Sequence, residues 1–143
     1  INYLQMCNDV ARFTEKESTK KYYFIDNGIL NLFLVHQEPA LLENLVAVQL
    51  CRTYGKDNVS YFSKDKEIDF IINEENLAIQ VSYSIKEDET FTRETEPLFS
   101  FVKKNPGWTP LIITYDETDT IERDGLTVNV VPAWKWLTST ENS

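Results

Sequence analysis

The sequence is poor in the residues from which several common kinds of active site are built. It contains one histidine, His36, and two cysteines, Cys7 and Cys51, among 143 residues. A single histidine cannot supply a histidine-based catalytic triad, and the cysteines show no metal-binding or redox spacing. We therefore expect His36 to be a surface residue, and Cys7 and Cys51 to be free thiols in a reducing cytoplasm.

Two further absences narrow the class of protein. No apolar run approaches the roughly 18 residues of a membrane-spanning helix, and no signal-peptide pattern opens the chain. The GxxxxGK[ST] loop that cradles nucleotide phosphates is also missing, so these residues cannot bind ATP in that manner. The sequence therefore predicts a cytoplasmic protein with no membrane partner.

Positive charge is scarce as well. Lysine and arginine number 14 against 23 aspartates and glutamates, which gives a formal net charge of −9. Because phosphate neutralisation dominates nucleic-acid affinity, this balance argues against a broad non-specific DNA-binding surface. A local basic patch stays open. The apolar share of 42% and the charged share of 26% are typical of a globular domain rather than a disordered chain.

The length suits one main domain with one core. The chain opens with isoleucine, and Ile1–Phe13 already has the composition of packed structure. We expect residues 1–20 to be a partial lead-in from a preceding region, for which a winged-helix domain is one candidate. Residues 21–137 are then the main domain, and residues 138–143 are expected to fray.

Hydrophobic patterning and turn residues predict the order of the elements. The clearest helix begins at Pro39, a favoured first helical position, and ends at Tyr54, before Gly55. A second helix is indicated over Pro97–Lys104, and a last helical turn over Ala133–Leu137. Extended segments are predicted at Tyr22–Ile25, Asn58–Ser63, Glu67–Asn73, Ala78–Ser84, Leu111–Tyr115 and Leu126–Val131.

Polar stretches separate these elements. Ile85–Glu96 is very polar and leads into the second helix. Glu117–Gly125 predicts an acidic loop with a turn at Asp124-Gly125, and Asp26-Asn27-Gly28 predicts another turn. Ile29–Leu34 is compatible with a short helix. The main order is therefore helix, three strands, helix, strand, strand.

Two carboxylates stand out because their neighbours are apolar. Asp69 lies in the middle of a predicted strand between two apolar residues, where an unpaired carboxylate is costly to bury. Glu43 lies on the first predicted helix and has Ala47 and Leu50 on the same side. Asp69 is consistent with a metal ligand or with a partly exposed aspartate paired to a lysine.

Gln80 and Ser82 stand two apart in a predicted strand, so their side chains point to one face. Apolar residues alternate with them and point to the other face. The pair predicts either a polar pocket on one side of the sheet or a solvent-facing edge. These two interpretations are equally supported by the residues alone.

Together, helix-borne Glu43, strand-borne Asp69 and the Gln80-x-Ser82 pair resemble the arrangement in PD-(D/E)XK nucleases. The local sequences are similar to one branch, the domain of unknown function found C-terminal to bacterial and archaeal AAA-type ATPases. The resemblance lies within Lys21–Leu137 and is carried by KYYFIDNGIL, ALLENLVAVQL, YFSKDKEIDFII, AIQVSYS and VVPAWKWL. It implies an α/β fold that is restriction-endonuclease-like, with an αβββαβ core and a mixed central sheet flanked by helices.

The sequence departs from the family at the third strand. The usual pattern there is Glu-x-Lys, in which carboxylates hold Mg²⁺ and the lysine activates water and stabilises phosphate charge. Gln80 brings no charge, and Ser82 replaces a cation worth on the order of a few kcal/mol in the transition state. The resemblance therefore implies a degenerate site, in which Asp69, Gln80 and Glu43 are candidate ligands of a weak Mg²⁺ site.

These residues leave two functions open. One is a non-catalytic nuclease-fold module that serves protein interaction or regulation beside the upstream ATPase domain, which would carry any ATP site. The other is a Mg²⁺-dependent DNA nuclease with a rearranged site, for which Lys66 and Lys86 are the nearest candidates for a migrated lysine. DNA binding without cleavage is disfavoured by the net charge.

Overall fold

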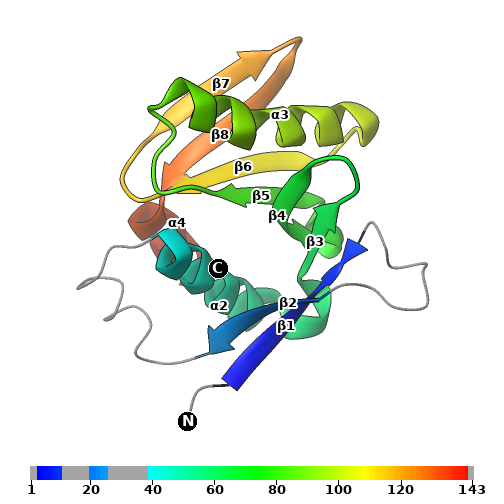
Figure 1. Ribbon diagram of the computed structural model, residues 1–143, viewed down its shortest axis with the longest axis vertical. Helices are drawn as coiled ribbons and strands as arrows, with labels where there is room; N and C mark the ends of the chain where they lie inside the picture. Colours follow the sequence, from blue (N-terminus) through cyan, green and yellow to red (C-terminus); the bar gives the residue numbers. More distant parts are fainter. Residues whose placement is uncertain (1–2, 11–19, 26–38, 142–143) are drawn as a thin grey trace.

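The computed structural model describes residues 3–10, 20–25 and 39–141, and Figure 1 shows how they are arranged. The turn predicted at residues 26–28, the helix predicted at Ile29–Leu34 and His36 lie outside the described residues. The elements are β1 (Tyr3–Asp9), β2 (Lys20–Ile25), α2 (Pro39–Tyr54), η2 (Lys56–Asn58), β3 (Ser60–Ser63), β4 (Glu67–Ile72), η3 (Asn73–Glu75), β5 (Leu77–Val81), α3 (Asp88–Lys104), β6 (Thr109–Thr114), β7 (Asp119–Arg123), β8 (Leu126–Pro132) and α4 (Ala133–Glu141).

The described strands form one mixed sheet in the order β2-β1-β3-β4-β5-β6-β8-β7. The β1–β3, β5–β6 and β6–β8 pairs are parallel, and the other neighbours are antiparallel. Helices α2 and α4 lie on one face of the sheet, and α3 covers the other (Figure 1). The predicted α/β fold with a mixed sheet flanked by helices is confirmed at this level.

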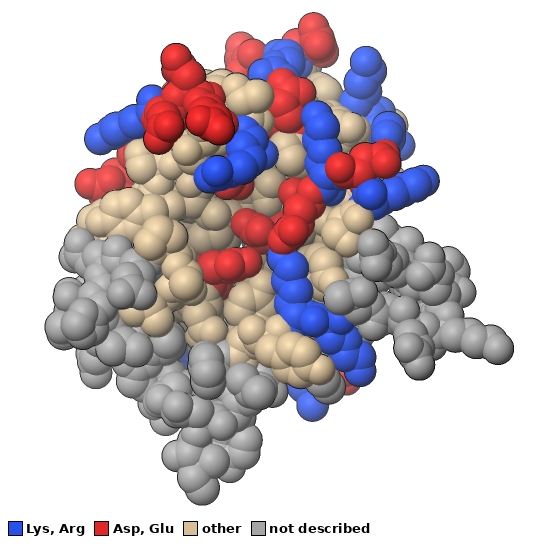
Figure 2. Space-filling model, in the orientation of Figure 1, with Lys and Arg blue, Asp and Glu red and all other residues tan. Residues whose placement is uncertain are grey.

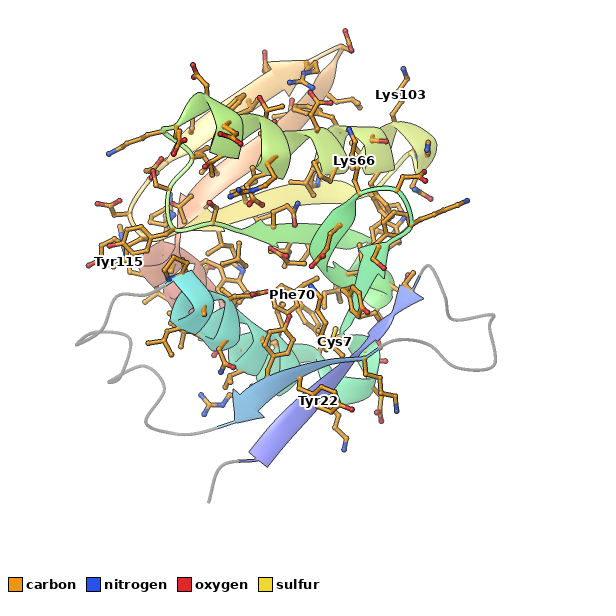
Figure 3. The ribbon with its side chains drawn as sticks, viewed as in Figure 1. Cys7, Tyr22, Lys66, Phe70, Lys103 and Tyr115 are labelled. Atoms are coloured by element: carbon orange, nitrogen blue, oxygen red, sulfur yellow. The ribbon has the colours of Figure 1, made fainter. Side chains whose placement is uncertain are left out.

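Two apolar layers hold the helices to the sheet. The layer under α2 and α4 includes Cys7 and Phe70, which Figure 3 labels between the sheet and α2. The layer under α3 includes Ile71 and Ile112, both with no exposed surface. At about 25 cal/mol per Å² of apolar surface removed from water, these layers are the main source of stability.

Helix α2 begins and ends at the residues predicted from Pro39 and Gly55. Gly55 has a φ of +87°, and its N–H donates to the carbonyl of Cys51 at 2.9 Å as the helix ends. Every residue of Leu42–Leu50 is buried except Glu43, which is half-buried. A helix enclosed on nearly all sides keeps its polar groups inside the fold, so Glu43 faces the interior of the domain.

Helix α3 begins at Asp88, well before the predicted start at Pro97, so much of the polar stretch Ile85–Glu96 is helical. The sequence left open whether Pro97 begins the helix or lies within it, and the structure places it inside α3. It has no N–H to donate to the carbonyl of Arg93. The apolar face of α3 packs on the sheet, which outweighs this local cost.

The acidic loop predicted at Glu117–Gly125 is wrong in part, because it contains strand β7. Strand β7 pairs antiparallel with β8 at the edge of the sheet. Charged side chains are usual on an edge strand and hide its pattern. The turn prediction at Asp124-Gly125 is confirmed: both residues have positive φ, +52° and +78°, as a two-residue hairpin requires.

The two ends of the chain also differ from expectation. Strand β1, in the predicted lead-in, pairs with both β2 and β3 and so belongs to the sheet. Helix α4 continues to Glu141, although fraying was expected from Thr138. Gln49 of α2 donates a hydrogen bond to Thr140 Oγ1 at 3.0 Å, which ties the end of α4 to α2. No helix in the described part of the chain is long and apolar enough to cross a membrane.

The prediction of free thiols is confirmed for Cys7 and Cys51. Cys7 is buried, and burial raises the pKa of the Cys51 thiol to about 11. Because the thiolate is the reactive form, Cys51 is a poor nucleophile near neutral pH. Neither cysteine therefore adds a catalytic group.

Candidate functional site

The candidate site is built where strands β4 and β5 separate. Their backbone pairing runs from Ile72 opposite Leu77 to Phe70 opposite Ile79. Beyond that point, the side chain of Gln80 bonds to the backbone of β4 in place of the backbone of β5. Gln80 Oε1 accepts a hydrogen bond from the Asp69 N–H at 2.9 Å, and Gln80 Nε2 donates to the Glu67 carbonyl at 3.0 Å. Gln80 is only 3% exposed, so its amide replaces water for two backbone groups.

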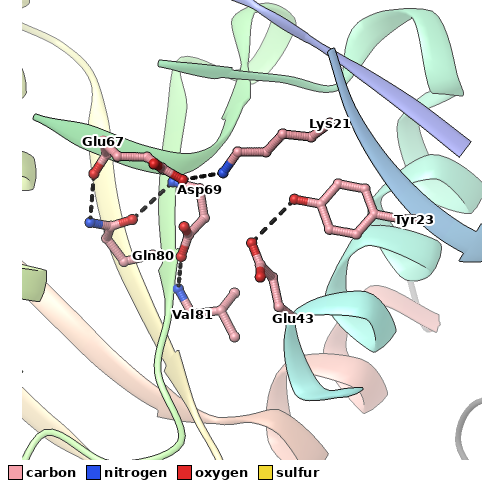
Figure 4. Close-up of polar contacts among 7 residues, drawn as sticks. All are labelled: Lys21, Tyr23, Glu43, Glu67, Asp69, Gln80 and Val81. Atoms are coloured by element: carbon pink, nitrogen blue, oxygen red, sulfur yellow. Dashed lines mark hydrogen bonds and ion pairs between the residues drawn. The ribbon is translucent and has the colours of Figure 1, made fainter. Parts of the chain in front are cut away.

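Asp69 completes this connection from the opposite side. Its Oδ2 accepts a hydrogen bond from the Val81 N–H at 2.8 Å. Figure 4 shows Asp69, Gln80 and Val81 joined in this way, together with four neighbouring residues. We refer to Lys21, Tyr23, Glu43, Glu67, Asp69, Gln80 and Val81 as the β4–β5 network. Of the family-like positions, Asp69 and Gln80 therefore bond to each other, and Glu43 lies near enough for its charge to act on Asp69.

The carboxyl group of Asp69 has an unusual protonation equilibrium. Burial raises its pKa, and the charges of Glu43 and Glu94 raise it further, to about 8. The hydrogen bond from Val81 and the charge of Lys21 act in the opposite direction but do not offset burial. Asp69 is therefore largely protonated at neutral pH in the arrangement described, and a protonated carboxyl group is a poor ligand for a hard cation.

Glu43 is oriented by a tyrosine from the sheet. Tyr23 Oη, on β2, donates to Glu43 Oε1 at 3.2 Å. Burial and the charge of Glu43 raise the pKa of Tyr23, so the phenol keeps its proton and remains a donor. The sequence pattern pointed to Glu43 but not to Tyr23. The only local signal was its place in the aromatic run Tyr22–Phe24.

Lys21 is the cation of the network. Its ammonium group forms an ion pair with Glu67 and lies 4.7 Å from the centre of the Tyr61 ring. Burial lowers the pKa of Lys21, but the hydrogen bond to Glu67 and the charges of Glu67, Asp69 and Glu43 outweigh it and raise the pKa. Lys21 therefore stays charged beside three carboxyl groups.

The two lysines suggested by the sequence differ in place: Lys66 helps to line a cavity that Asp69 and Gln80 also line, whereas Lys86 does not. Lys66 lies 3.8 Å from a carboxylate oxygen of Glu96, on the α3 side. Lys86 is exposed, and its backbone N–H donates to the Ser84 hydroxyl. Lys21 was missed because it is far from Asp69 in sequence, and the pairing of β2 with β1 brings it near.

Ser82 does not join the network. It follows the end of β5, which corrects the prediction of a strand through Ser84. Its hydroxyl donates to the carbonyl of Ser84 at 2.8 Å, and its N–H donates to the carbonyl of Ile113 at 3.0 Å. The position that is lysine in the nuclease pattern is thus used for a local turn.

A cavity of about 520 Å³ lies between β4 and α3, beside the network. Asp69 and Gln80 form part of its wall, with Glu67 and Glu94. Burial raises the pKa of Glu94, while Arg93, whose Nε lies 3.5 Å from a Glu94 oxygen, lowers it. Figure 2 shows acidic side chains in the middle of this face, bordered by lysine and arginine side chains. Glu43 does not line this cavity.

The donor set does not fit a divalent cation as it stands. Gln80 Oε1 already accepts the Asp69 N–H and brings no charge, and Asp69 Oδ2 already accepts the Val81 N–H. Among the described residues, no three His, Cys, Asp or Glu side chains group closely enough to hold a metal ion. A cation would have to share these oxygens with the backbone N–H groups that join β4 to β5, so no chemical step is placed on a metal.

What the arrangement can do is structural. Each family-like group is bonded to a neighbouring strand or helix, and among the described residues no buried side-chain nitrogen or oxygen lacks a hydrogen-bond partner. A satisfied polar network of this kind fixes one arrangement of its elements. No model of a known family, no curated protein and no solved structure matches this chain.

Proposed function

We propose that this chain is a non-catalytic, nuclease-fold module of an AAA-type ATPase, and that it acts in protein interaction or regulation. The order α2-β3-β4-β5-α3-β6 supports the proposal, since it is the αβββαβ order of the nuclease core. Glu43 on the helix, Asp69 on the middle strand and Gln80 on the third also stand where the resemblance expects site residues. An ATP site would belong to the adjoining ATPase domain.

The single observation that carries the loss of catalysis is the position of the Gln80 amide. Both of its ends bond to the backbone of β4, at 2.9 and 3.0 Å. A cation at this position would have to share the Gln80 carbonyl oxygen with the Asp69 N–H, and it would gain no negative charge from the amide. The lysine position, Ser82, is likewise directed away from the network.

The proposal is tested by incubating the chain with supercoiled plasmid and with single-stranded DNA, in Mg²⁺ or Mn²⁺, beside Asp69→Ala. We expect neither protein to cut. Cutting by the wild type that is lost in Asp69→Ala would overturn the proposal, because contaminating nuclease would be equal in both preparations.

A second candidate, a Mg²⁺-dependent nuclease with a rearranged site, is favoured by one observation. Lys21 supplies a cation near Asp69 and Glu43, from a strand outside the usual pattern. This candidate predicts cutting that is abolished by Lys21→Met and retained by Lys20→Met, an exposed neighbour on the same strand. Without cutting by the wild type, the second candidate fails.

A further inference from the structure

A surface richer in positive charge than the rest of the protein lies next to the cavity of the β4–β5 network, with which it shares Lys66, Glu96 and Pro97. Two hollows, of about 280 and 360 Å³, adjoin there, because Lys66 and Ser100 contribute to the walls of both. The lysines and arginine that line them come from the β3–β4 turn, the end of α3 and the β7–β8 hairpin. We call this surface the basic groove; its cations are Lys64, Lys66, Lys103, Lys104 and Arg123.

The concentration of positive charge here is unusual for this chain. The two hollows are lined by five cations and three acidic residues, Asp65, Glu96 and Asp124, whereas the whole chain carries a net charge of −9. Figure 2 shows lysine and arginine side chains gathered at the upper right, and Figure 3 labels Lys66 and Lys103 along this side of α3. The lining of the groove therefore carries a net positive charge on a protein whose net charge is negative.

Part of the positive charge is held in place, and part is available. Glu96 forms ion pairs with both Arg123 and Lys66, and Arg123 also lies 4.7 Å from the centre of the Phe99 ring. By contrast, Lys64, Lys103 and Lys104 are exposed and form no ion pair with any residue that the structure describes. The ion-paired group of Arg123, Glu96 and Lys66 shapes the groove, and the other three lysines are available to bind a ligand.

The helix dipole does not account for the whole surface. Lys103 and Lys104 stand in the last turn of α3, where cations are favoured by the carbonyl ends of the helix. Lys64 and Lys66 come from the β3–β4 turn, and Arg123 comes from β7, so three separate elements bring cations together. Convergence from separate elements indicates a ligand of negative charge.

The chemistry of the groove favours a carboxylate-rich peptide over a nucleic acid. Of the rings that line the groove, Phe99 and Phe101 are buried at 5% and 8% exposure, and the half-buried Phe62 ring packs edge-on against Phe101, so a base finds little open ring face on which to stack. A nucleic-acid strand long enough to bind would also pass over the acidic surroundings of the groove, where its phosphates are repelled. A short acidic peptide can remain within the two hollows.

We propose that the basic groove docks an acidic, Asp/Glu-rich segment of a protein partner. The proposal deepens the interaction role proposed above and rests on it, and it concerns a surface that adjoins the network cavity without including Asp69 or Gln80. Lys64, Lys103 and Lys104 bind the peptide carboxylates, and the Arg123–Glu96–Lys66 group fixes the shape of the groove.

The test is fluorescence anisotropy with a labelled decaglutamate peptide at low salt, with a single-stranded DNA oligonucleotide of similar charge as the second probe. We compare the wild type with Lys103→Ala/Lys104→Ala and, on a separate element, with Lys64→Ala. The matched control is Lys56→Ala/Lys135→Ala, which removes the same charge from two exposed lysines outside the groove. Circular dichroism confirms that each variant is folded.

We expect the wild type to bind the peptide more tightly than the DNA. Lys103→Ala/Lys104→Ala should weaken peptide binding by roughly tenfold, Lys64→Ala by a smaller factor, and the control by less than about twofold. No binding of the peptide, tighter binding of the DNA, or equal loss in the groove and control variants would each overturn the proposal. The DNA-cutting assay is independent of this result, so failure of the groove and failure of the proposed function are distinguishable.

Discussion

The side-chain carbonyl of Gln80 accepts a hydrogen bond from the backbone N–H of Asp69 at 2.9 Å. The amide that resembles a metal-binding position is therefore a bridge between two strands. Its NH2 group also donates to the carbonyl of Glu67, which a glutamate at this position could not do when ionised. Glutamine is thus the side chain that suits a structural role, and glutamate is the one that suits a metal.

We expect Gln80→Leu to lower the free energy of unfolding by about 1–3 kcal/mol, because two buried backbone groups lose their partners. Urea denaturation measures the change. Gln49→Leu is the matched control, since the Gln49 amide bonds to the rotatable hydroxyl of Thr140, which also donates to the carbonyl of Leu137. Equal losses in the two variants would contradict the bridging role of Gln80.

The raised pKa of Asp69 makes stability depend on pH. In the unfolded chain an aspartate ionises near pH 4, whereas in the folded protein Asp69 ionises at about pH 8. The folded state therefore holds one more proton between these values. The contribution of Asp69 to stability is fully present below pH 4, and it is lost as pH rises through 8.

Asp69→Asn should remove this dependence and still accept the Val81 N–H. We expect the variant to gain stability relative to the wild type as pH rises from 4 to 8, by on the order of a few kcal/mol. Urea denaturation at a series of pH values provides the measurement. Parallel pH profiles for the two proteins would show that Asp69 is ionised in both states.

Lys21 opposes the rise in the pKa of Asp69, so its removal should shift that titration to higher pH. We expect Lys21→Gln to move the midpoint upward, as followed by the ¹³C shift of the Asp69 carboxyl group in NMR. Lys20→Gln, an exposed change on the same strand, should not move it. The effect of Lys21→Gln on stability should be small, up to about 1 kcal/mol, because its partner Glu67 is largely exposed.

Much of the fold could be predicted from local chemistry. Pro39 and Gly55 defined α2 because each has a backbone preference that acts without distant contacts. Asp124-Gly125 marked the hairpin turn for the same reason. Strand β7 could not be predicted in this way, since its residues Asp119–Arg123 become a strand only through pairing with β8. Helix α3 likewise depends on packing of one apolar face.

The sequence predicted which residues belong to the site better than it predicted the hydrogen bonds between them. Glu43 and Asp69 stood out because a carboxylate among apolar neighbours needs a reason. The hydrogen-bond partners of Gln80 could not be predicted, because an amide group can both accept and donate. The place of Lys21 in the site could not be predicted, because strand pairing rather than local sequence brings it to Glu67.

The most direct test of a structural rather than metal-binding network is a Mn²⁺ titration of ¹⁵N-labelled protein followed by NMR. Paramagnetic broadening identifies the groups nearest to a bound ion. If the network is structural, the signals of the Gln80 side-chain NH2 and of the Asp69 backbone N–H remain sharp at millimolar Mn²⁺, and both groups exchange slowly with solvent. Selective broadening of these two signals at low Mn²⁺, absent in Asp69→Asn, would contradict it and restore the metal site.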